Sequence, residues 1–264
     1  MDVKGKVVWI TGASSGIGAG LAVAMSKQGA RLMLSARREE KLAAVRAACV
    51  DPEAHLILPL DLAATETLPA AAEQALGFAG HIDILVNNGG VSHRSRVEET
   101  TDLTIERQVM EVNYFGAVAL TKAVLPSMLE RGSGHVVVVS SVMGKFSTPL
   151  RSAYAASKHA LHGFFDALRA EVWDAGIRVT IICPGYIRTE ISYHALTADG
   201  GTHGKLDPGQ AKGMSPEKCA AGIIRAIEKE KAEVRIGGPE TLVVHLKRFM
   251  PGLLNTVIRK VKVT

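Results

Sequence analysis

Cysteines are scarce in this sequence, with only 3 among 264 residues. Cys49, Cys183 and Cys219 lie far apart in the chain and form no C-x-x-C or Cys/His pair. Metal sites and disulfide frameworks usually show such spacings. We therefore expect no metal site and no disulfide, and a reducing cytoplasmic location fits this cysteine usage.

Long apolar runs and a strong charge bias are also missing. The run Val7–Ile10 is too short for a signal-peptide core, and no stretch reaches the ~18 uninterrupted apolar residues of a membrane span. The 31 basic and 26 acidic residues leave a net charge of +5, which calls for no nucleic-acid partner by itself. A hydrophobic content of 47% excludes a disordered chain. We expect a soluble or at most peripheral protein.

Short apolar runs alternate with longer helical patterns up to about residue 184. Several runs are β-branched and apolar on both faces, which is typical of parallel strands covered by helices on each side. We predict strands at 7–11, 31–35, 55–59, 84–86, 136–139 and 179–182, and helices at 19–28, 39–48 and 104–131. The repeated order predicts an α/β fold with a doubly wound parallel sheet, in one domain over residues 1–264 because no linker or repeat interrupts it.

A glycine-rich turn, TGASSGIG at 11–18, follows the first predicted strand and precedes a helix starting near Ile17. Gly12, Gly16 and Gly18 let the backbone bend sharply and approach a ligand. The helix amino terminus then offers free N–H groups to a pyrophosphate. Because the G-x-x-x-G-x-G spacing matches the generic dinucleotide fingerprint only in part, a plain tight turn is the alternative. We favour dinucleotide binding, because the turn directly follows the first strand.

The same turn also fits the G-x-S-x-G nucleophile elbow of α/β-hydrolases, with Ser14 as the nucleophile. A turn after the first strand leaves no earlier loop to supply an oxyanion donor, so this hydrolase is the weaker hypothesis.

The second predicted strand ends in Leu34-Ser35-Ala36 and is followed by Arg37 and Arg38. This position reads the adenosine ribose, with an acid for a free 2′-hydroxyl and an arginine for a 2′-phosphate. Guanidinium groups pair bidentately with phosphate, so the sequence favours NADP(H) over NAD(H). The alternative is that both arginines are solvated residues at a helix start.

A third constellation combines Ser141, after the predicted strand 136–139, with Tyr154 and Lys158. Residues four apart share one helix face, so the phenol and the ammonium can converge. A phenol of pKa about 10 is a reluctant acid or base, and a nearby cation favours its ionised form. Ser141 could hydrogen-bond a substrate oxygen on which charge develops. Together with the glycine turn, this group indicates proton transfer coupled to hydride transfer.

These motifs resemble those of the short-chain dehydrogenase/reductase family. The matching segments follow the family order over about residues 5–190: 11–18, Asp61-Leu62, 87–90, Asn113, Ser140-Ser141, Tyr154-x-x-x-Lys158 and Pro184-Gly185 with Thr189. The family more often has Asn-Asn-Ala-Gly where this chain has Asn-Asn-Gly-Gly at 87–90, a change that we expect to alter packing near the adenosine.

The resemblance implies a Rossmann-type sheet and NADPH-dependent interconversion of a carbonyl and an alcohol, with Tyr154 as general acid/base. It implies a catalytic centre of Ser141, Tyr154 and Lys158, with Asn113 in a structural and proton-relay role. Asp61 would meet the adenine ring, and the stretch from Pro184 would meet the nicotinamide. The cofactor-binding residues that we expect are Gly12, Ser14, Ser15, Gly16, Ile17, Gly18, Arg37, Arg38, Asp61, Leu62, Asn87, Gly89, Tyr154, Lys158, Pro184, Gly185, Ile187 and Thr189.

The family also usually pairs the helices around 104–131 and 154–174 between subunits, so a homodimer or homotetramer is expected. A redox-inactive NADPH-binding sensor remains the second alternative to the enzyme.

The segment 189–214 is rich in glycine and has little periodicity, so we expect a substrate lid. Ser215-Pro216 then predicts the start of a helix that runs to Ile227. We expect residues 143–151 and 186–214 to line the pocket, in particular Met143, Phe146, Leu150, Tyr186, Ile191, Tyr193, His194 and Leu196. Because they are largely apolar, we expect a hydrophobic ketone or secondary alcohol as the substrate.

The carboxyl-terminal tail, about 240–264, has an apolar stripe at helical spacing with basic residues between. Its members are Leu242, Leu246, Phe249, Leu253, Val257 and Val261, with Lys247, Arg248, Arg259, Lys260 and Lys262. Pro251 predicts a division into two short helices. We favour packing of the stripe on this domain or on a partner subunit over contact with an anionic membrane surface.

Overall fold

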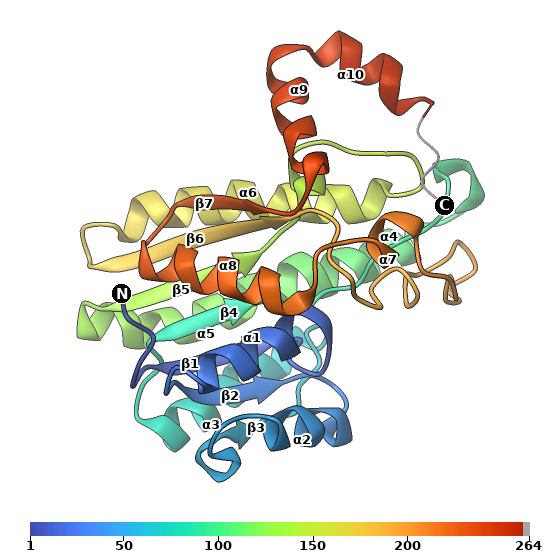
Figure 1. Ribbon diagram of the computed structural model, residues 1–264. Coiled ribbons are helices and arrows are strands. Elements are labelled where there is room, and N and C mark those ends of the chain that lie inside the picture. Colours follow the sequence, from blue (N-terminus) through green and yellow to red (C-terminus); the bar gives the residue numbers. More distant parts are fainter. Residues whose placement is uncertain (261–264) are drawn as a thin grey trace.

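The computed structural model describes residues 1–260, which fold around one seven-stranded sheet (Figure 1). All strands are parallel, in the order β3-β2-β1-β4-β5-β6-β7, so the strand order reverses between β1 and β4. The strands are β1 (Val7–Thr11), β2 (Arg31–Ser35), β3 (Leu56–Ile57), β4 (Ile84–Asn87), β5 (Gly134–Val139), β6 (Ile177–Pro184) and β7 (Glu233–Ile236). The predicted Rossmann-type doubly wound sheet is confirmed. Ligands bind such sheets at the carboxyl ends of the strands beside the point of reversal.

Strand β7 was not predicted from the sequence. It lies at the edge of the sheet, and two of its four residues, Glu233 and Arg235, are exposed and charged. Such a strand lacks the continuous apolar run that marks the central strands.

Helices cover both faces of the sheet, and the strand side chains alternate between the two layers. In β1, Val8 and Ile10 pack in the layer with α1, α2 and α8, whereas Val7 and Trp9 pack in the layer with α3, α5 and α6. This alternation explains why the strand is apolar on both faces. The bounds are α1 (Gly16–Ser26), α2 (Glu39–Ala47), α3 (Leu68–Ala79), α5 (Gly116–Arg131), α6 (Ser152–Val172) and α8 (Pro216–Glu228).

The segment predicted as one helix at 104–131 contains a local change of helix type. It divides into α4 (Thr104–Met110), the π-helical turn η4 (Glu111–Phe115) and α5. By length and composition alone this run is apolar enough to cross a membrane. In the structure Leu120, Val124 and Met128 are fully buried against the sheet, so it serves as a covering helix of the core.

The last third of the chain surrounds the carboxyl edge of the sheet. Segment 189–214 is mainly irregular and holds only the short helix α7 (Pro208–Ala211). The Ser215 hydroxyl caps α8 by accepting a hydrogen bond from the Lys218 N–H at 3.4 Å, as predicted. The tail forms η6 (Pro239–Leu242), α9 (Val243–Phe249) and α10 (Pro251–Ile258), so the division at Pro251 is confirmed. Val261 and Lys262 lie outside the described residues.

Residues 1–260 also contain five short 3₁₀ helices. Four of them are η1 (Pro52–Ala54), η2 (Thr65–Thr67), η3 (Val97–Glu99) and η5 (Val142–Gly144), and the fifth is η6 in the tail.

Candidate functional site

The glycine turn between β1 and α1 is built by close backbone approach. Gly12 and Gly16 have φ values of 63° and 55°, a region that strains other residues. A Cβ at Gly12 would lie 2.7 Å from the Cα of Gly89, in the loop after β4. The turn therefore packs directly on the neighbouring strand's loop, where a side chain would not fit.

Two residues of the matched motifs, Thr11 and Asn88, hold this turn in place. The Asn88 side-chain amide donates to the Thr11 carbonyl at 2.9 Å and to the Gly12 carbonyl at 3.2 Å. The Thr11 hydroxyl accepts hydrogen bonds from the Asn88 and Gly89 N–H groups, both at 3.0 Å. Neither side chain could be assigned this role from the sequence, because the two residues are far apart in the chain and meet only in the folded protein.

The amino terminus of α1 is free to bind an anion. Helix α1 begins at Gly16, no side chain caps it, and no acid lies in its first turn. Thr189, after β6, approaches from the other side: its Cγ2 lies 2.9 Å from the position of a Cβ on Gly16. The turn that carries Ser14, Ser15, Ile17 and Gly18 therefore fits the pyrophosphate of a dinucleotide.

The residues expected around the adenosine are found at the same edge of the sheet. Arg37 and Arg38 are exposed after β2, Asp61 is exposed, and Leu62 is buried. Asn87 is different, because its buried side chain donates to the Thr121 hydroxyl of α5 at 2.9 Å. That side chain faces the helix layer, so its role here is to fix the end of β4.

Ser141, Tyr154 and Lys158 are buried together where β5 meets α6. The Ser141 hydroxyl accepts a hydrogen bond from the Met143 N–H at 3.1 Å and donates to the Pro184 carbonyl at 3.5 Å. The Lys158 ammonium donates to the Val139 carbonyl at 2.9 Å and lies 5.7 Å from the centre of the Tyr154 ring. The structure therefore brings the three predicted catalytic residues together.

Burial dominates the proton affinities in this cluster. It raises the pKa of Tyr154, and this effect is opposed by the Ser141 side chain and by the cations Arg151 and Arg94. Burial also lowers the pKa of Lys158 to about 8. We expected Lys158 to lower the pKa of Tyr154, but in this structure the two arginines are the cations with that effect. The reason is spatial, because both arginines fold against the phenol from other segments.

Asn113 connects the site to the loop after β4. Its side-chain oxygen accepts from the Val91 N–H at 2.8 Å, and its amide donates to the Val91 carbonyl at 3.0 Å and to the Ser157 hydroxyl at 2.9 Å. These bonds show the expected structural role. A Cβ at Gly90 would lie 2.9 Å from the Asn113 Oδ1, so this glycine is needed beside the catalytic group.

A cavity of about 70 Å³ opens beside Ser141 and Tyr154. Met143, Phe146, Tyr186 and Ile191 line it as predicted, whereas the other four predicted lining residues do not. Leu150 adopts a positive φ of 67°, Tyr193 is 46% exposed, His194 lies 3.6 Å from Glu190, and Leu196 bridges to His93. Thr148, Arg151 and Gln210 also line it and lie within the two predicted stretches, whereas Ser92, Val142 and Glu240 lie outside them and were not predicted. The pocket is therefore more polar than the sequence suggested.

Pro184 ends β6, Gly185 and Ile187 follow it, and Gly185 lines the pocket. The Gly185 N–H donates to the Ile236 carbonyl at 2.8 Å, and Ile187 is buried and pairs with Met214. Comparison with known proteins agrees with this geometry. Residues 6–199 match the family described as short chain dehydrogenase. The chain belongs to the short-chain dehydrogenase/reductase family.

Relatives of this short-chain dehydrogenase/reductase are similar over nearly its whole length. It is 45% identical over 265 residues to the Drosophila melanogaster "Dehydrogenase/reductase SDR family protein 7-like", covering 98% of this chain and 81% of that protein. It is 46% identical to the Bos taurus "Dehydrogenase/reductase SDR family member 7B", covering 95% and 79%.

Solved structures show the same fold. A short-chain dehydrogenase from Streptomyces avermitilis is 34% identical with a TM-score of 0.79, covering 97% of this chain and 99% of that one. A Burkholderia cenocepacia enzyme in complex with NADP is 26% identical with a TM-score of 0.81, covering 98% and 99%. A Burkholderia phymatum enzyme in complex with NAD is 25% identical with a TM-score of 0.82, covering 96% of each chain. The family thus uses NAD(P)(H).

The tail of this short-chain dehydrogenase/reductase reaches the catalytic pocket. Leu254 of α10 is 2% exposed and packs in a cluster with Val142, Met143, Phe146 and Tyr154. One face of the tail therefore packs on its own domain, the arrangement that we favoured. Helices α9 and α10 stand out from the body of the protein (Figure 1), and several apolar side chains of the tail are exposed. The exposed apolar residues are Leu242, Phe249, Met250, Leu253 and Val257. If the tail contacted an anionic membrane surface, the alternative considered above, these exposed residues would make the contact.

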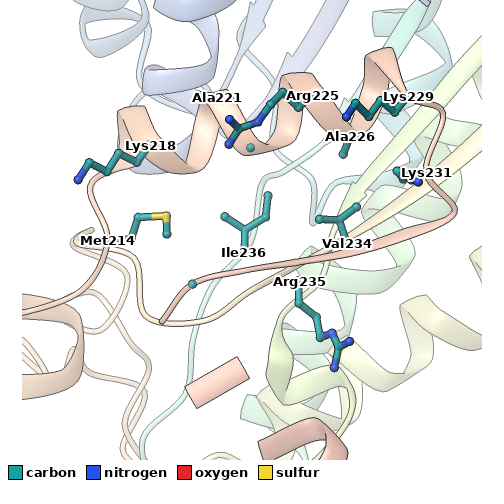
Figure 2. Close-up of a pocket in the computed structure, with 12 residues that line it drawn as sticks. Met214, Lys218, Ala221, Arg225, Ala226, Lys229, Lys231, Val234, Arg235 and Ile236 are labelled. Atoms are coloured by element: carbon teal, nitrogen blue, oxygen red, sulfur yellow. The ribbon is translucent and has the colours of Figure 1, made fainter. Parts of the chain in front are cut away.

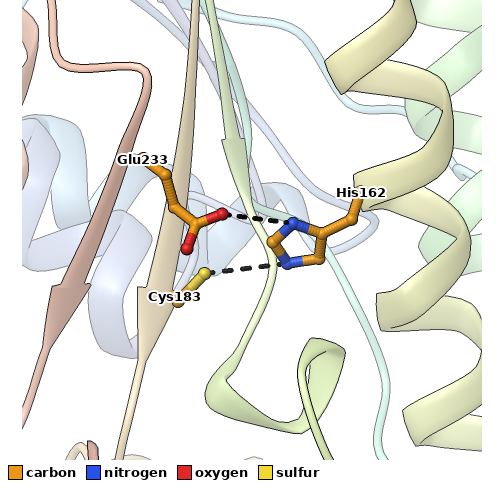
Figure 3. A group of neighbouring side chains, drawn as sticks. All are labelled: His162, Cys183 and Glu233. Carbon is orange, nitrogen blue, oxygen red and sulfur yellow. Dashed lines mark hydrogen bonds and ion pairs between the residues drawn. The ribbon is translucent and has the colours of Figure 1, made fainter. Parts of the chain in front are cut away.

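A group of three donor side chains, His162, Cys183 and Glu233, lies behind the site (Figure 3). The two ring nitrogens face different neighbours: Nε2 lies 3.7 Å from the Cys183 sulfur, and Nδ1 lies 3.6 Å from a Glu233 oxygen. Burial raises the pKa of Cys183 to about 12 and lowers that of His162 to about 4. Lys145 also lies 2.6 Å from the same carboxylate. The sequence gave no sign of this group, because its members come from α6, β6 and β7.

A second cavity of about 630 Å³ lies between α8 and β7, away from the catalytic residues (Figure 2). Its floor is apolar, with Ala226, Val234 and Ile236 among the lining residues. The cationic side chains around it are Lys218, Arg225, Lys229, Lys231 and Arg235.

Proposed function

We propose that this NAD(P)-dependent oxidoreductase interconverts a ketone or aldehyde and an alcohol on a small molecule, with NADP(H) as cofactor. The observation that carries the proposal is the burial of Ser141, Tyr154 and Lys158 together beside a pocket at the carboxyl edge of the sheet. The glycine turn at 11–18 and the cluster of Ser141, Tyr154 and Lys158 both lie at the carboxyl edge of the sheet, where such folds bind dinucleotides.

Each catalytic side chain has a distinct task. The bound nicotinamide supplies or accepts a hydride at the carbonyl carbon. In the reductive direction, the Tyr154 hydroxyl donates its proton to the carbonyl oxygen, and the Ser141 hydroxyl hydrogen-bonds that oxygen as negative charge develops. The cations Arg94 and Arg151 favour the phenolate that remains. Lys158 is proposed to hold the nicotinamide ribose and to pass protons to solvent, with Asn113 positioning a water. Alcohol oxidation reverses these proton transfers.

Removal of the Tyr154 hydroxyl tests the proposal. We expect Tyr154→Phe to retain NADPH affinity and to lose turnover by roughly 100- to 10,000-fold, the usual contribution of a general acid or base. NADPH absorbance with a panel of carbonyl compounds measures turnover, and tryptophan-to-nicotinamide energy transfer measures binding. Tyr114→Phe removes the same group outside the pocket and serves as the control. Retained turnover in Tyr154→Phe would refute the assignment of the acid.

The same panel separates the enzyme from the alternatives. An NADPH-binding sensor would bind NADPH without consuming it with any carbonyl compound. The serine-hydrolase hypothesis is not supported, because the chain belongs to the short-chain dehydrogenase/reductase family.

The preference for NADP(H) is supported by Arg37 and Arg38, which are exposed at the end of β2 where no carboxylate stands. We expect Arg37→Ala to raise the dissociation constant of NADPH about tenfold and to leave that of NADH nearly unchanged, since only NADPH carries the 2′-phosphate. Arg46→Ala, at the other end of α2, is the matched control. Equal losses for both nucleotides would contradict the assignment.

A cytoplasmic location and a homo-oligomeric state complete the proposal. The three free cysteines are all buried, and such thiols suit a reducing compartment. No nucleic-acid partner is proposed.

A further inference from the structure

A buried ion cluster fastens the lid to the catalytic helix. Asp207, the lid residue before α7, accepts hydrogen bonds on one carboxylate oxygen from both Arg94 and Arg151, each at 2.5 Å. Arg94 lies in the loop after β4, and Arg151 directly precedes α6, which carries Tyr154. The side chains are 2% exposed for Asp207 and Arg94 and 8% exposed for Arg151.

The charges of this cluster do not balance. Two guanidiniums face one carboxylate, so one positive charge stays uncompensated in a dry environment. Within the described residues, Asp207 is the one carboxylate within ion-pair distance of either arginine. A buried charge without a partner is strongly unfavourable. The excess charge therefore calls for a second anion.

Neighbouring titratable groups do not supply that anion. Burial lowers the pKa of His93, so its ring stays neutral, and protonation of His203, 3.9 Å from Asp207, would add positive charge. Glu240 lines the same pocket, but its carboxylate is not within ion-pair distance of Arg94 or Arg151, and one of its oxygens is held by the Tyr186 and Gly238 N–H groups at 2.8 and 2.9 Å.

The unpaired charge lies in the wall of the catalytic pocket. Arg151 lines this pocket together with Ser141, Tyr154 and Gln210. The Nε of Arg151 and the side-chain oxygen of Gln210 are buried without a hydrogen-bond partner in the described part of the chain. Apolar side chains form another part of the wall, from Val142, Met143, Phe146 and Ile191.

We propose that the substrate is an amphiphilic carbonyl compound whose carboxylate or phosphate binds Arg151 as its second counter-ion, with its carbon chain against the apolar wall. This inference rests on the proposed oxidoreductase function and specifies the substrate class. Guanidinium binds either oxyanion bidentately, so the two sources share one recognition chemistry.

The competing explanation is that the arginines act only through Tyr154. Both cations favour the ionised phenol, so their excess charge would serve proton transfer with any substrate. The two explanations differ in what removal of Arg151 does. Loss of an anion subsite affects only charged substrates, whereas loss of phenol activation affects every substrate.

The test uses substrate pairs that differ only in the anion. For the carboxylate, 4-oxononanoate is compared with its methyl ester, and for the phosphate, 2-oxononyl phosphate is compared with 1-hydroxynonan-2-one. We expect the full-length wild-type enzyme to reduce one or both anions with kcat/KM roughly 100-fold above that of the neutral partner. The pair with the larger ratio identifies the anion.

Substitution of Arg151 then locates the preference. Arg151→Gln should reduce the anion-to-neutral ratio to near one, and Arg151→Lys should restore part of it because the charge is kept. Arg96→Gln, at an exposed arginine on the neighbouring segment, is the matched control and should leave the ratio at its wild-type value.

Three outcomes would overturn the inference. In the first, the wild type shows equal kcat/KM for the anionic and the neutral substrate of each pair. In the second, Arg151→Gln leaves the anion-to-neutral ratio of kcat/KM unchanged. In the third, Arg151→Gln lowers kcat/KM equally for anionic and neutral substrates and shifts the pH profile to higher pH. Should Arg151→Gln fail to fold, the wild-type ratio decides alone. Failure of the proposed function is distinct, because neutral carbonyls would then give no NADPH consumption at all.

Discussion

The buried ammonium of Lys158 shows how much one residue's surroundings matter. Its pKa is lowered from 10.5 to about 8 by burial. Because the folded-state pKa lies below the unfolded one, the charged lysine destabilises the fold by about 3 kcal/mol at neutral pH. This cost is relieved only as pH rises from about 8 to 10.5. A buried cation of this kind beside Tyr154 and Ser141 indicates a functional rather than a stabilising role.

Loss of the Lys158 proton should set the alkaline limit of reduction. We expect kcat/KM for carbonyl reduction to be level below pH 8 and to fall above about pH 8, because this parameter reports groups of the free enzyme. The pKa of Tyr154 is raised, so the phenol keeps its proton through this range. His135 and His162, with pKa values near 4, stay neutral there. A profile that stays level to pH 10 would exclude Lys158 as the titrating group.

At the scale of elements, the tail and the lid decide access to the pocket. The 70 Å³ cavity is far below the 300–1,000 Å³ of usual ligand sites, so substrate entry requires one of these elements to move. The lid is fastened by the Asp207 ion cluster, whereas α10 is held mainly by Leu254. Both contacts reach the segments that carry Tyr154.

Tail docking can be tested with two adjacent leucines. We expect Leu254→Ala to loosen α10 and to speed tryptic cleavage after Arg248 and Arg259, because a buried leucine is worth 2–5 kcal/mol. Leu253 is 47% exposed, so Leu253→Ala should leave the cleavage rate unchanged. Limited proteolysis of the folded enzyme measures both. Equal rates in the two variants would show that the tail is not held through Leu254.

On the scale of the whole molecule, two surfaces bear on assembly. Phe115 at the end of η4, Leu129 of α5 and Trp173 directly after α6 are between 43% and 51% exposed, on or beside the helices that the family usually pairs. The second surface is the sheet edge formed by β7, which borders the cationic groove between α8 and β7 (Figure 2). A twofold contact across that edge would bring like charges together.

We therefore expect a dimer formed through α5 and α6. Light scattering coupled to gel filtration should give the mass of two chains, and Leu129→Asp should shift the protein to monomer because it buries a charge in the interface. Val50→Asp, at an apolar residue that is 54% exposed elsewhere, is the control. A wild-type mass of four chains would show that the cationic edge does not prevent a second interface.

The sheet, the glycine turn and the grouping of Ser141, Tyr154 and Lys158 could be predicted from the sequence. These features depend on local patterns: β-branched runs for strands, glycines where φ is positive, and a four-residue spacing that puts Tyr154 and Lys158 on one helix face. Strand β7 was not predicted, because an exposed edge strand lacks a continuous apolar run. The π-helical turn that contains Asn113 was not predicted either.

The surroundings of Tyr154 and Lys158 could not be predicted from the sequence, because they depend on tertiary contacts. Arg94, Arg151 and Asp207 come from three segments that are separated by more than fifty residues, and nothing local marks them as partners. The burial that sets the proton affinities of Tyr154 and Lys158 also arises from long-range packing. A local spacing can place two side chains on one face of a helix, but charge balance and desolvation depend on every segment that closes over them.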